Sequence, residues 1–261
     1  MSFDKVQITT LDEADQMADM GFLPQVRKLL NYTPPTGQRL LFSATLDGDV
    51  NKLVEQFLHD PVVHSTAPVT AAVESMSHHL FFVGDRPARN EVVMRIAARA
   101  GKTIMFMRTK HGVDRQVKKL RRAGINAYPL HGDKGQGART RAISGFADGS
   151  IPVLVATDIA ARGIDIADVS LVVHVDPPAE HKAYLHRAGR TARGGATGTV
   201  VTLVTDEQRS EVAALIKKAG VSATEHDISH RDNPAGAPEL RTVTGARKPH
   251  GPALPPPGQD G

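Results

Sequence analysis

From residue 79 onward the chain alternates short apolar runs with stretches of helical length, and this alternation constrains the fold more than any other feature. The runs that predict strands are 79–83, 103–107, 126–130, 152–156, 170–175 and 198–204. The stretches that predict helices are 86–100, 111–123, 137–147, 180–188 and 206–219. Near-continuous apolar strands between helices are typical of a parallel sheet that is covered by helices on both faces. The sequence therefore predicts an α/β fold with one complete domain over residues 79–225.

The residues on either side of this domain are organised differently. Residues 1–67 predict only a partial α/β domain, with helices at 16–31 and 47–58, a strand at 39–43 and a short last strand at 62–63. Residues 68–78 have no sustained period and predict a linker. Residues 226–261 hold seven Pro and five Gly, so we expect a disordered tail there.

Composition narrows the class of protein. No apolar run reaches the length of about eighteen residues that a membrane helix needs, and the first residues lack the pattern of a signal peptide. The chain has no cysteine, which excludes disulfides and thiolate metal sites. Its twelve histidines show no zinc-ligand spacing. These features favour a cytoplasmic protein that makes no contact with a membrane.

Positive charge is concentrated in the predicted complete domain. Residues 68–225 carry 23 Lys and Arg against 15 Asp and Glu, a balance of +8, and residues 108–141 alone carry ten against two. A basic surface of this kind indicates a phosphate backbone as partner. For the group Lys118, Lys119, Arg121 and Arg122, a solvated helix face is an equally good interpretation.

The string Asp12-Glu13-Ala14-Asp15 carries the first chemical signal. Carboxylates after a short apolar-biased stretch suit a strand end at which Mg²⁺ and a water are held beside a nucleotide. Such a site also needs a phosphate-binding loop of the form G-x-x-x-x-G-K-[ST]. That pattern occurs nowhere in the chain, and only eleven residues precede Asp12.

Further strings follow in a characteristic order. They are Ser43-Ala44-Thr45, His131-Gly132-Asp133 with residues 136–139 after it, residues 156–165 (ATDIAARGID), and residues 186–193 (HRAGRTAR). In this order and spacing the chain resembles the DEAD-box family of ATP-dependent RNA helicases in superfamily 2, over roughly residues 11 to 220. The resemblance implies RecA-like domains that close over ATP and RNA.

The resemblance also implies roles for individual residues in the handling of ATP. Asp12 would hold Mg²⁺ through water, Glu13 would orient or activate the attacking water, and Asp165 would accept from the ribose of ATP. Arg190 and Arg193 would be arginine fingers at the γ-phosphate. The residues that would couple the state of ATP to domain closure are Asp15, Ser43, Thr45 and His186.

For RNA, the resemblance points to contacts with the sugar–phosphate backbone, which carry no sequence code. The residues concerned are Gly132, Asp133, Gln136, Arg139 and Thr157. Because the chain has no Trp and only 4% aromatic residues, base stacking is not expected to dominate binding.

The chain departs from the family pattern at its start, where the phosphate-binding loop and other first-domain motifs are missing. We therefore expect an N-terminally truncated helicase, which binds ATP and Mg²⁺ productively only with an upstream segment. A gene fragment, a frameshift or misplaced start, and a natural short form would each explain this. The alternative function is a non-catalytic module that binds RNA or a protein partner, and no particular protein partner is predicted.

Overall fold

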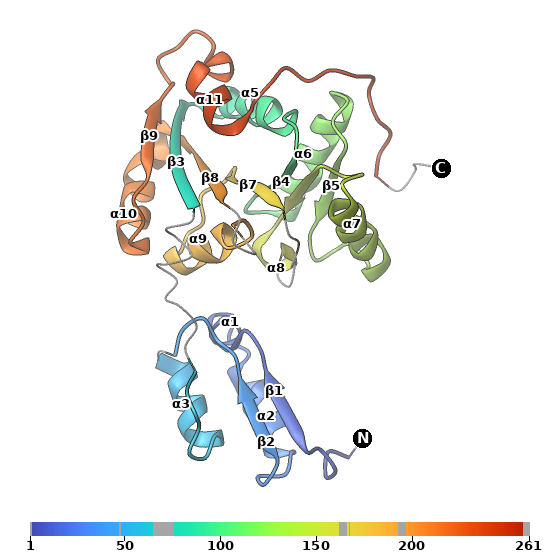
Figure 1. Ribbon diagram of the computed structural model, residues 1–261, viewed down its shortest axis with the longest axis vertical. Coiled ribbons are helices and arrows are strands. Elements are labelled where there is room, and N and C mark those ends of the chain that lie inside the picture. The colour runs from blue at the N-terminus through green and yellow to red at the C-terminus, as the bar shows by residue number, and fades with distance from the viewer. Residues whose placement is uncertain are drawn as a thin grey trace. The chain divides into compact units, whose positions relative to one another are not determined.

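The computed structural model describes residues 2–46, 48–64, 76–161, 166, 168–192 and 197–257, in two compact units that span residues 1–66 and 67–261 (Figure 1). The first unit contains a two-stranded parallel sheet, and the second contains a seven-stranded sheet.

The first unit packs three helices with its small sheet. Its elements are β1 (Ile8–Leu11), α1 (Ala14–Asp19), α2 (Leu23–Asn31), β2 (Gln38–Leu41) and α3 (Gly48–Phe57). Strands β1 and β2 run parallel with Leu11 opposite Leu41, and both side chains pack on a core formed by α2 and α3. Every second residue of each strand is exposed, including Ile8 at 59%.

Two sequence predictions for this unit are wrong. The expected helix 16–31 is broken into α1 and α2, because Gly21 adopts a left-handed conformation with φ 73° and Pro24 stands in the first turn of the second helix. The expected strand at 62–63 does not form; Val62 and Val63 are 79% and 68% exposed and bury no surface that would stabilise a strand. Asp47, the first residue of the expected helix 47–58, lies outside the described residues.

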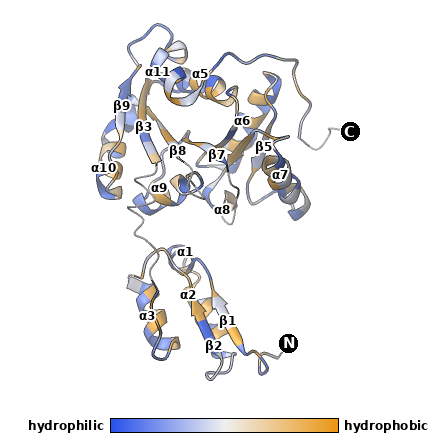
Figure 2. Ribbon diagram, in the orientation of Figure 1, coloured by the Kyte–Doolittle hydropathy of each residue, from blue (hydrophilic) through white to orange (hydrophobic). Residues whose placement is uncertain are grey.

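The sheet of the second unit is entirely parallel, with the order β5-β6-β4-β7-β8-β3-β9. Its strands are β3 (Met76–Gly84), β4 (Lys102–Phe106), β5 (Ala127–Leu130), β6 (Val153–Ala156), β7 (Val169–His174), β8 (Gly198–Thr205) and β9 (Thr224–Asp227). The first six of these strands are those that the apolar runs predicted. Much of the hydrophobic colour in Figure 2 lies on this sheet.

Helices cover both faces of the large sheet, which confirms the predicted fold class. They are α5 (Arg86–Ala97), α6 (Lys110–Arg122), α7 (Gln136–Asp148), α8 (Asp158–Ala161), α9 (His181–Ala188), the 3-10 turn η1 (Asp206–Gln208) and α10 (Arg209–Ala219). Met105 of β4 packs in the core with α5 and α6, whereas its neighbours Ile104 and Phe106 pack in the core with α7, α8, α9 and α10. This alternation is the period of a strand that is buried on both faces. Thr205 and Gln208 form a capping box at η1.

The prediction of a disordered tail over residues 226–261 is wrong for residues 226–257. Strand β9 adds to the edge of the sheet with His226 opposite Phe81, and it is followed by the turn η2 (Pro234–Gly236) and helix α11 (Pro238–Thr244). Leu240 of α11 is fully buried in the same core as α5 and α6. A few well-placed apolar residues thus attach a Pro- and Gly-rich segment that has too little periodicity to predict a fold.

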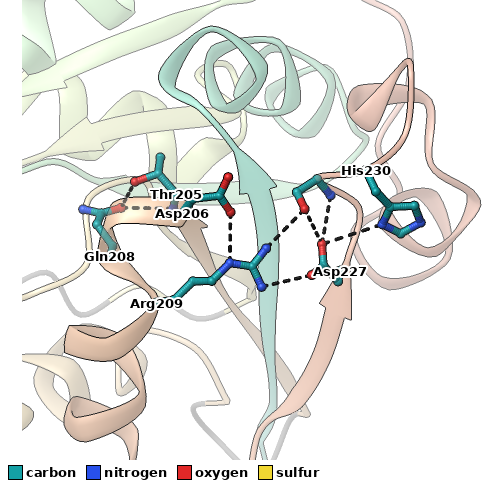
Figure 3. A network of polar contacts seen from close by, with 7 residues as sticks. Thr205, Asp206, Gln208, Arg209, Asp227 and His230 are labelled. Carbon is teal, nitrogen blue, oxygen red and sulfur yellow. Dashed lines mark hydrogen bonds and ion pairs between the residues drawn. The ribbon is translucent and has the colours of Figure 1, made fainter.

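A polar network fastens β9 to the start of α10 (Figure 3). The Arg209 guanidinium lies over the Phe82 ring at 4.3 Å and donates to Asp206 at 2.9 Å and to Asp227 at 2.9 Å. Hydrogen bonds from Arg209 and Ser229 lower the pKa of Asp227 to about 2. The Asp227 carboxylate therefore keeps its charge over the whole neutral range.

The last described residues run along α5 and then α6 (Figure 1). The Arg247 amide donates to the Arg95 carbonyl at 3.0 Å, and the Leu254 amide donates to the Arg121 carbonyl at 2.8 Å. Arg121 is only 2% exposed and donates to the Pro255 carbonyl, so both sequence interpretations of this residue are wrong. Gly124, with φ 80°, permits the approach, because a Cβ there would lie 2.8 Å from the Gly251 carbonyl oxygen.

Among the helices of the described ranges, none combines the length and the apolar character that crossing a membrane requires.

We predict that Leu240→Ala lowers the free energy of unfolding of the second unit by about 2–4 kcal/mol, because it leaves a cavity under α11. Thr242→Ala, on an exposed position of the same helix, is the matched control and should change it by less than about 0.5 kcal/mol. Urea unfolding measures both values. Equal stability of the two variants would show that α11 does not contribute to the core.

Candidate functional site

The register of the parallel sheet gathers the sequence-predicted residues of the second unit at one edge. Leu130 pairs with Ala156, Ala156 with Phe106, and Phe106 with His174. Because all strands point the same way, the segments that follow these four residues meet at the carboxyl edge of the sheet. They include residues 131–139, 157–161 and 175–176, and this group is called the carboxyl-edge site below.

The five candidate RNA residues all lie in two of these segments. The Thr157 amide donates to the Leu130 carbonyl at 3.1 Å, which joins the segment after β6 to the segment after β5. The Arg139 guanidinium donates to the Ala160 carbonyl at 2.6 Å and crosses between the same two segments. Gly132, Asp133 and Gln136 are exposed beside them. The structure therefore brings the five predicted residues together.

The start of α7 has the properties of an anion site. Gly135 caps this thirteen-residue helix without any side-chain hydrogen bond, so the first amide groups of the helix are not covered by a cap. A Cβ at Gly132 or Gly135 would meet no atom within 4 Å. An open helix N-terminus with a partial positive charge favours a phosphate group.

Two carboxylates at the same edge contact basic side chains. Lys110 contacts Asp133 at 2.7 Å, and this hydrogen bond lowers the pKa of the Asp133 carboxyl. Asp114 contacts His131 at 3.1 Å and Lys134 at 3.0 Å. Burial raises the pKa of Asp114, but the hydrogen bonds from His131 and Lys134 outweigh burial and lower it overall. Asp114 and Lys110 were not predicted; their only signal in the sequence is the basic stretch 108–141.

Arg187 is a positioning residue of the candidate site that the sequence did not single out. It is 3% exposed, donates to the Asp158 carboxylate at 2.8 Å and to the Asp176 carbonyl at 2.8 Å, and lies 5.1 Å from the Phe106 ring centroid. This paired contact fixes α9 against the segments after β6 and β7. Its place beside His186 in the string HRAGR was a signal, but the partner Asp158 could not be read from spacing.

Arg187 thereby positions the candidate residues at the end of α9. His186 and Arg190 are half-buried, and the Arg190 guanidinium donates to the His186 carbonyl at 3.3 Å. Arg193 and Asp165, the other predicted nucleotide contacts, lie outside the described residues.

A buried group of aromatic and histidine side chains packs between α9 and the sheet. Tyr184 is fully buried, and its hydroxyl lies 2.9 Å from Nδ1 of His78. The His174 ring stacks edge-on against Tyr184, with 4.8 Å between centroids, and its Nδ1 lies 3.0 Å from the Thr202 hydroxyl. Burial lowers the pKa of His78 to about 4, and burial with the nearby Arg187 charge lowers the pKa of His174 well below its ordinary value.

In the first unit, the predicted coupling residues Asp15, Ser43 and Thr45 are joined by hydrogen bonds. The Asp15 amide donates to the Ser43 hydroxyl at 3.1 Å, and that hydroxyl donates to the Thr45 carbonyl at 2.6 Å. The pairing of β1 with β2 makes this possible, because both strings follow strands that end in register.

Glu13 stands in a left-handed conformation, with φ 51° and ψ 47°. A non-glycine residue pays about 1–3 kcal/mol for such a backbone, and residues of this kind cluster at functional sites. Asp12 is exposed, and its Oδ1 accepts from the Glu13 amide at 2.8 Å. A carboxylate oxygen in this position suits a water-bound Mg²⁺. Within the described ranges, no three His, Asp or Glu side chains gather to hold a metal ion by themselves.

Comparison with known proteins agrees with this geometry. Residues 1–53 match the protein-family model for DEAD/DEAH box helicases, and residues 88–195 match the model for the helicase conserved C-terminal domain. The ATP-dependent RNA helicase DBP2 of Eremothecium gossypii is 39% identical over 217 residues, which cover 81% of this chain and 39% of that protein. RhlB of Pseudomonas syringae pv. tomato is 37% identical over 220 residues, which cover 83% and 55%.

Solved structures show the same likeness. S. cerevisiae Dbp5 bound to RNA and ADP BeF3 has a TM-score of 0.80 at 28% identity, covering 94% of this chain and 65% of that one. E. coli SrmB, bound to the regulator of ribonuclease activity A, has a TM-score of 0.54 at 32% identity, covering 67% and 98%. The chain belongs to the DEAD-box family of superfamily 2 RNA helicases. It spans about 40% of the length of the curated DBP2 relatives that it matches.

We predict that Asp158→Asn lowers the free energy of unfolding of the second unit by about 2–3 kcal/mol, because it leaves the buried Arg187 guanidinium without its carboxylate. Asp232→Asn makes the same chemical change at an exposed position and should have almost no effect. Chemical denaturation of both variants provides the measurement. A loss no larger than that of the control would mean that Arg187 does not depend on Asp158.

We also predict that the second unit loses stability as the pH falls from about 6.5 towards about 4. His78 and His174 have lowered pKa values in the folded state, so the unfolded chain takes up protons that the folded chain resists. Their contribution is therefore present above pH 6.5 and is lost across this window. Unfolding free energies at a series of pH values should show a shallower slope for His78→Gln and an unchanged slope for the exposed His111→Gln. Equal slopes for all three proteins would refute the assignment.

Proposed function

We propose that this chain supplies the RNA-binding edge and the second-domain arginines of an ATP-dependent RNA helicase, which couples ATP hydrolysis to RNA binding and local unwinding of duplexes. The observation that carries the proposal is the carboxyl-edge site. There the Arg139 guanidinium, an uncapped helix start and the residues of two family strings lie together. Support comes also from Dbp5, whose similar structure is bound to RNA and ADP BeF3.

The RNA contacts in this proposal are made with the sugar–phosphate backbone. The open N-terminus of α7 and the Arg139 guanidinium offer donors to phosphate oxygens. The hydroxyl of Thr157 offers a further donor beside them. None of these groups reads a base, so the binding is independent of sequence.

For ATP, we propose roles for the Asp12–Asp15 string of the first unit and for Arg190 and Arg193 in the sequence of the second. Asp12 would hold Mg²⁺ through water, and the metal would neutralise charge on the phosphates. Glu13 accepts a proton from the attacking water or orients it, and Arg190 places positive charge at the γ-phosphate. Four residues couple the state of the nucleotide to the closure of the domains: Asp15, Ser43, Thr45 and His186.

We predict that Arg139→Ala weakens binding to all RNA sequences about equally, by about tenfold, and lowers the dependence of affinity on salt by about one phosphate contact. The control is Arg122→Ala, an equal change of charge at an exposed position of α6. Fluorescence anisotropy with several unrelated single-stranded RNAs at several salt concentrations measures both effects. Strong sequence selectivity, or an affinity that salt does not alter, would contradict the proposal.

The chain by itself is expected to show no RNA-stimulated hydrolysis of ATP, because its sequence contains no G-x-x-x-x-G-K-[ST] to hold the triphosphate. The closest match, Gly101-Lys102-Thr103, starts β4, where Lys102 pairs with Asp168 at 2.9 Å. Joining the chain to the upstream part of a relative such as RhlB should create an RNA-dependent ATPase that Arg190→Ala abolishes. A fused protein that binds RNA and ATP but never turns over would favour the alternative, a non-catalytic RNA-binding module.

A further inference from the structure

A basic pocket lies between the end of α5 and the C-terminal segment of the second unit. Its volume is about 540 Å³. Four cationic side chains line it, from Arg95, Arg241, Arg247 and Lys248, and small residues such as Ala235 and Ala237 complete its wall. No acidic residue lines this pocket in the part of the chain that the structure describes. The pocket is called the α5–α11 pocket below.

The positive charge of this pocket is not neutralised from within. Glu239, the acidic residue of α11, pairs with Arg231 outside the pocket. The side chains of Arg95, Arg241 and Lys248 make no hydrogen bond or ion pair with any described residue. Four cations around one space repel each other, and an anion that entered it would relieve this repulsion.

The pocket has a rigid base. Leu240, fully buried, and Ala235 and Ala237, nearly so, anchor α11 and the preceding turn in the core beside α5. The Arg247 side chain is held in place, because its guanidinium donates to the Ala98 carbonyl and its amide donates to the Arg95 carbonyl. The Arg247 guanidinium is thus in place before any ligand arrives, which lowers its share of the entropic cost of binding.

The α5–α11 pocket is separate from the carboxyl-edge site. Helix α5 begins directly after β3, at the carboxyl edge, and runs back along the sheet, with Arg95 in its last turn. At 1.5 Å per residue, the nine steps from Arg86 to Arg95 place the pocket about 14 Å along the helix from that edge. A ligand that fills the carboxyl-edge site therefore leaves this pocket free.

We propose that the α5–α11 pocket binds backbone phosphate of an RNA strand that extends past the carboxyl-edge site. This inference rests on the proposed RNA-binding function and adds a second place at which the protein contacts the RNA. Guanidinium groups match phosphate oxygens with forked donors. Arg241, Arg247 and Lys248 are exposed, so the pocket is open to a passing chain. The pocket is also larger than a single phosphate needs.

The test compares RNA of two lengths on the whole chain. The double variant Arg241→Gln/Lys248→Gln removes two positive charges. Both side chains are exposed and make no hydrogen bond or ion pair with any described residue, so the fold should not change. Binding to a single-stranded RNA of about 20 nucleotides should weaken about tenfold or more, and its salt dependence should fall by one to two contacts. Binding to an RNA of about 6 nucleotides, which fills only the carboxyl-edge site, should stay within about twofold of the parent. The matched control Lys217→Gln/Lys218→Gln, at exposed positions of α10, should bind both RNAs as the parent does.

Each other outcome overturns the inference. An equal loss for both RNA lengths, or an unchanged affinity for the long RNA, would show that the pocket takes no RNA. One further outcome is that inorganic tripolyphosphate raises the melting temperature of the parent but not of the variant, while the variant loses affinity for neither RNA length. That result would assign the pocket to a free anion instead. If the parent binds neither RNA, the proposed function itself fails, and the inference fails with it. If the parent binds the short RNA, and the variant binds the long RNA as tightly as the parent does, only the inference fails.

Discussion

The parallel register of the seven-stranded sheet is the constraint on which the second unit depends. Because every strand points the same way, residues that follow different strands, and are far apart in sequence, end at one edge. The contact between the Thr157 amide and the Leu130 carbonyl is a direct result. Burial of both sheet faces makes a change of register costly, since a shift by one residue would exchange the two cores.

A second layer of interactions attaches α9 to that edge. Arg187 joins the helix to Asp158 and to the Asp176 carbonyl. Tyr184 packs the helix against buried histidines. These contacts place His186 and Arg190 without taking part in the chemistry proposed for them. The left-handed Glu13 in the first unit is held in a comparable way, by strand pairing and by the Asp12 carboxylate.

The sequence was informative where apolar burial is continuous and silent where it is sparse. Strands such as β6 are buried at every position, so their runs stand out, and the family strings located the candidate RNA residues. Helix α11 could not be predicted, because Leu240 and a few alanines anchor it within a segment rich in Pro and Gly. The pairing of Arg187 with Asp158 depends on the sheet register, and no local pattern records it.

The central claim is that the carboxyl edge of the sheet is the surface that meets RNA. Hydrogen–deuterium exchange on the whole chain, with and without a short single-stranded RNA, tests it most directly. We expect slower exchange of the amides in residues 132–139 and 157–161, and little change at Lys217 and Lys218 on α10. Protection confined to other surfaces, with residues 132–139 unchanged while RNA is bound, would contradict it.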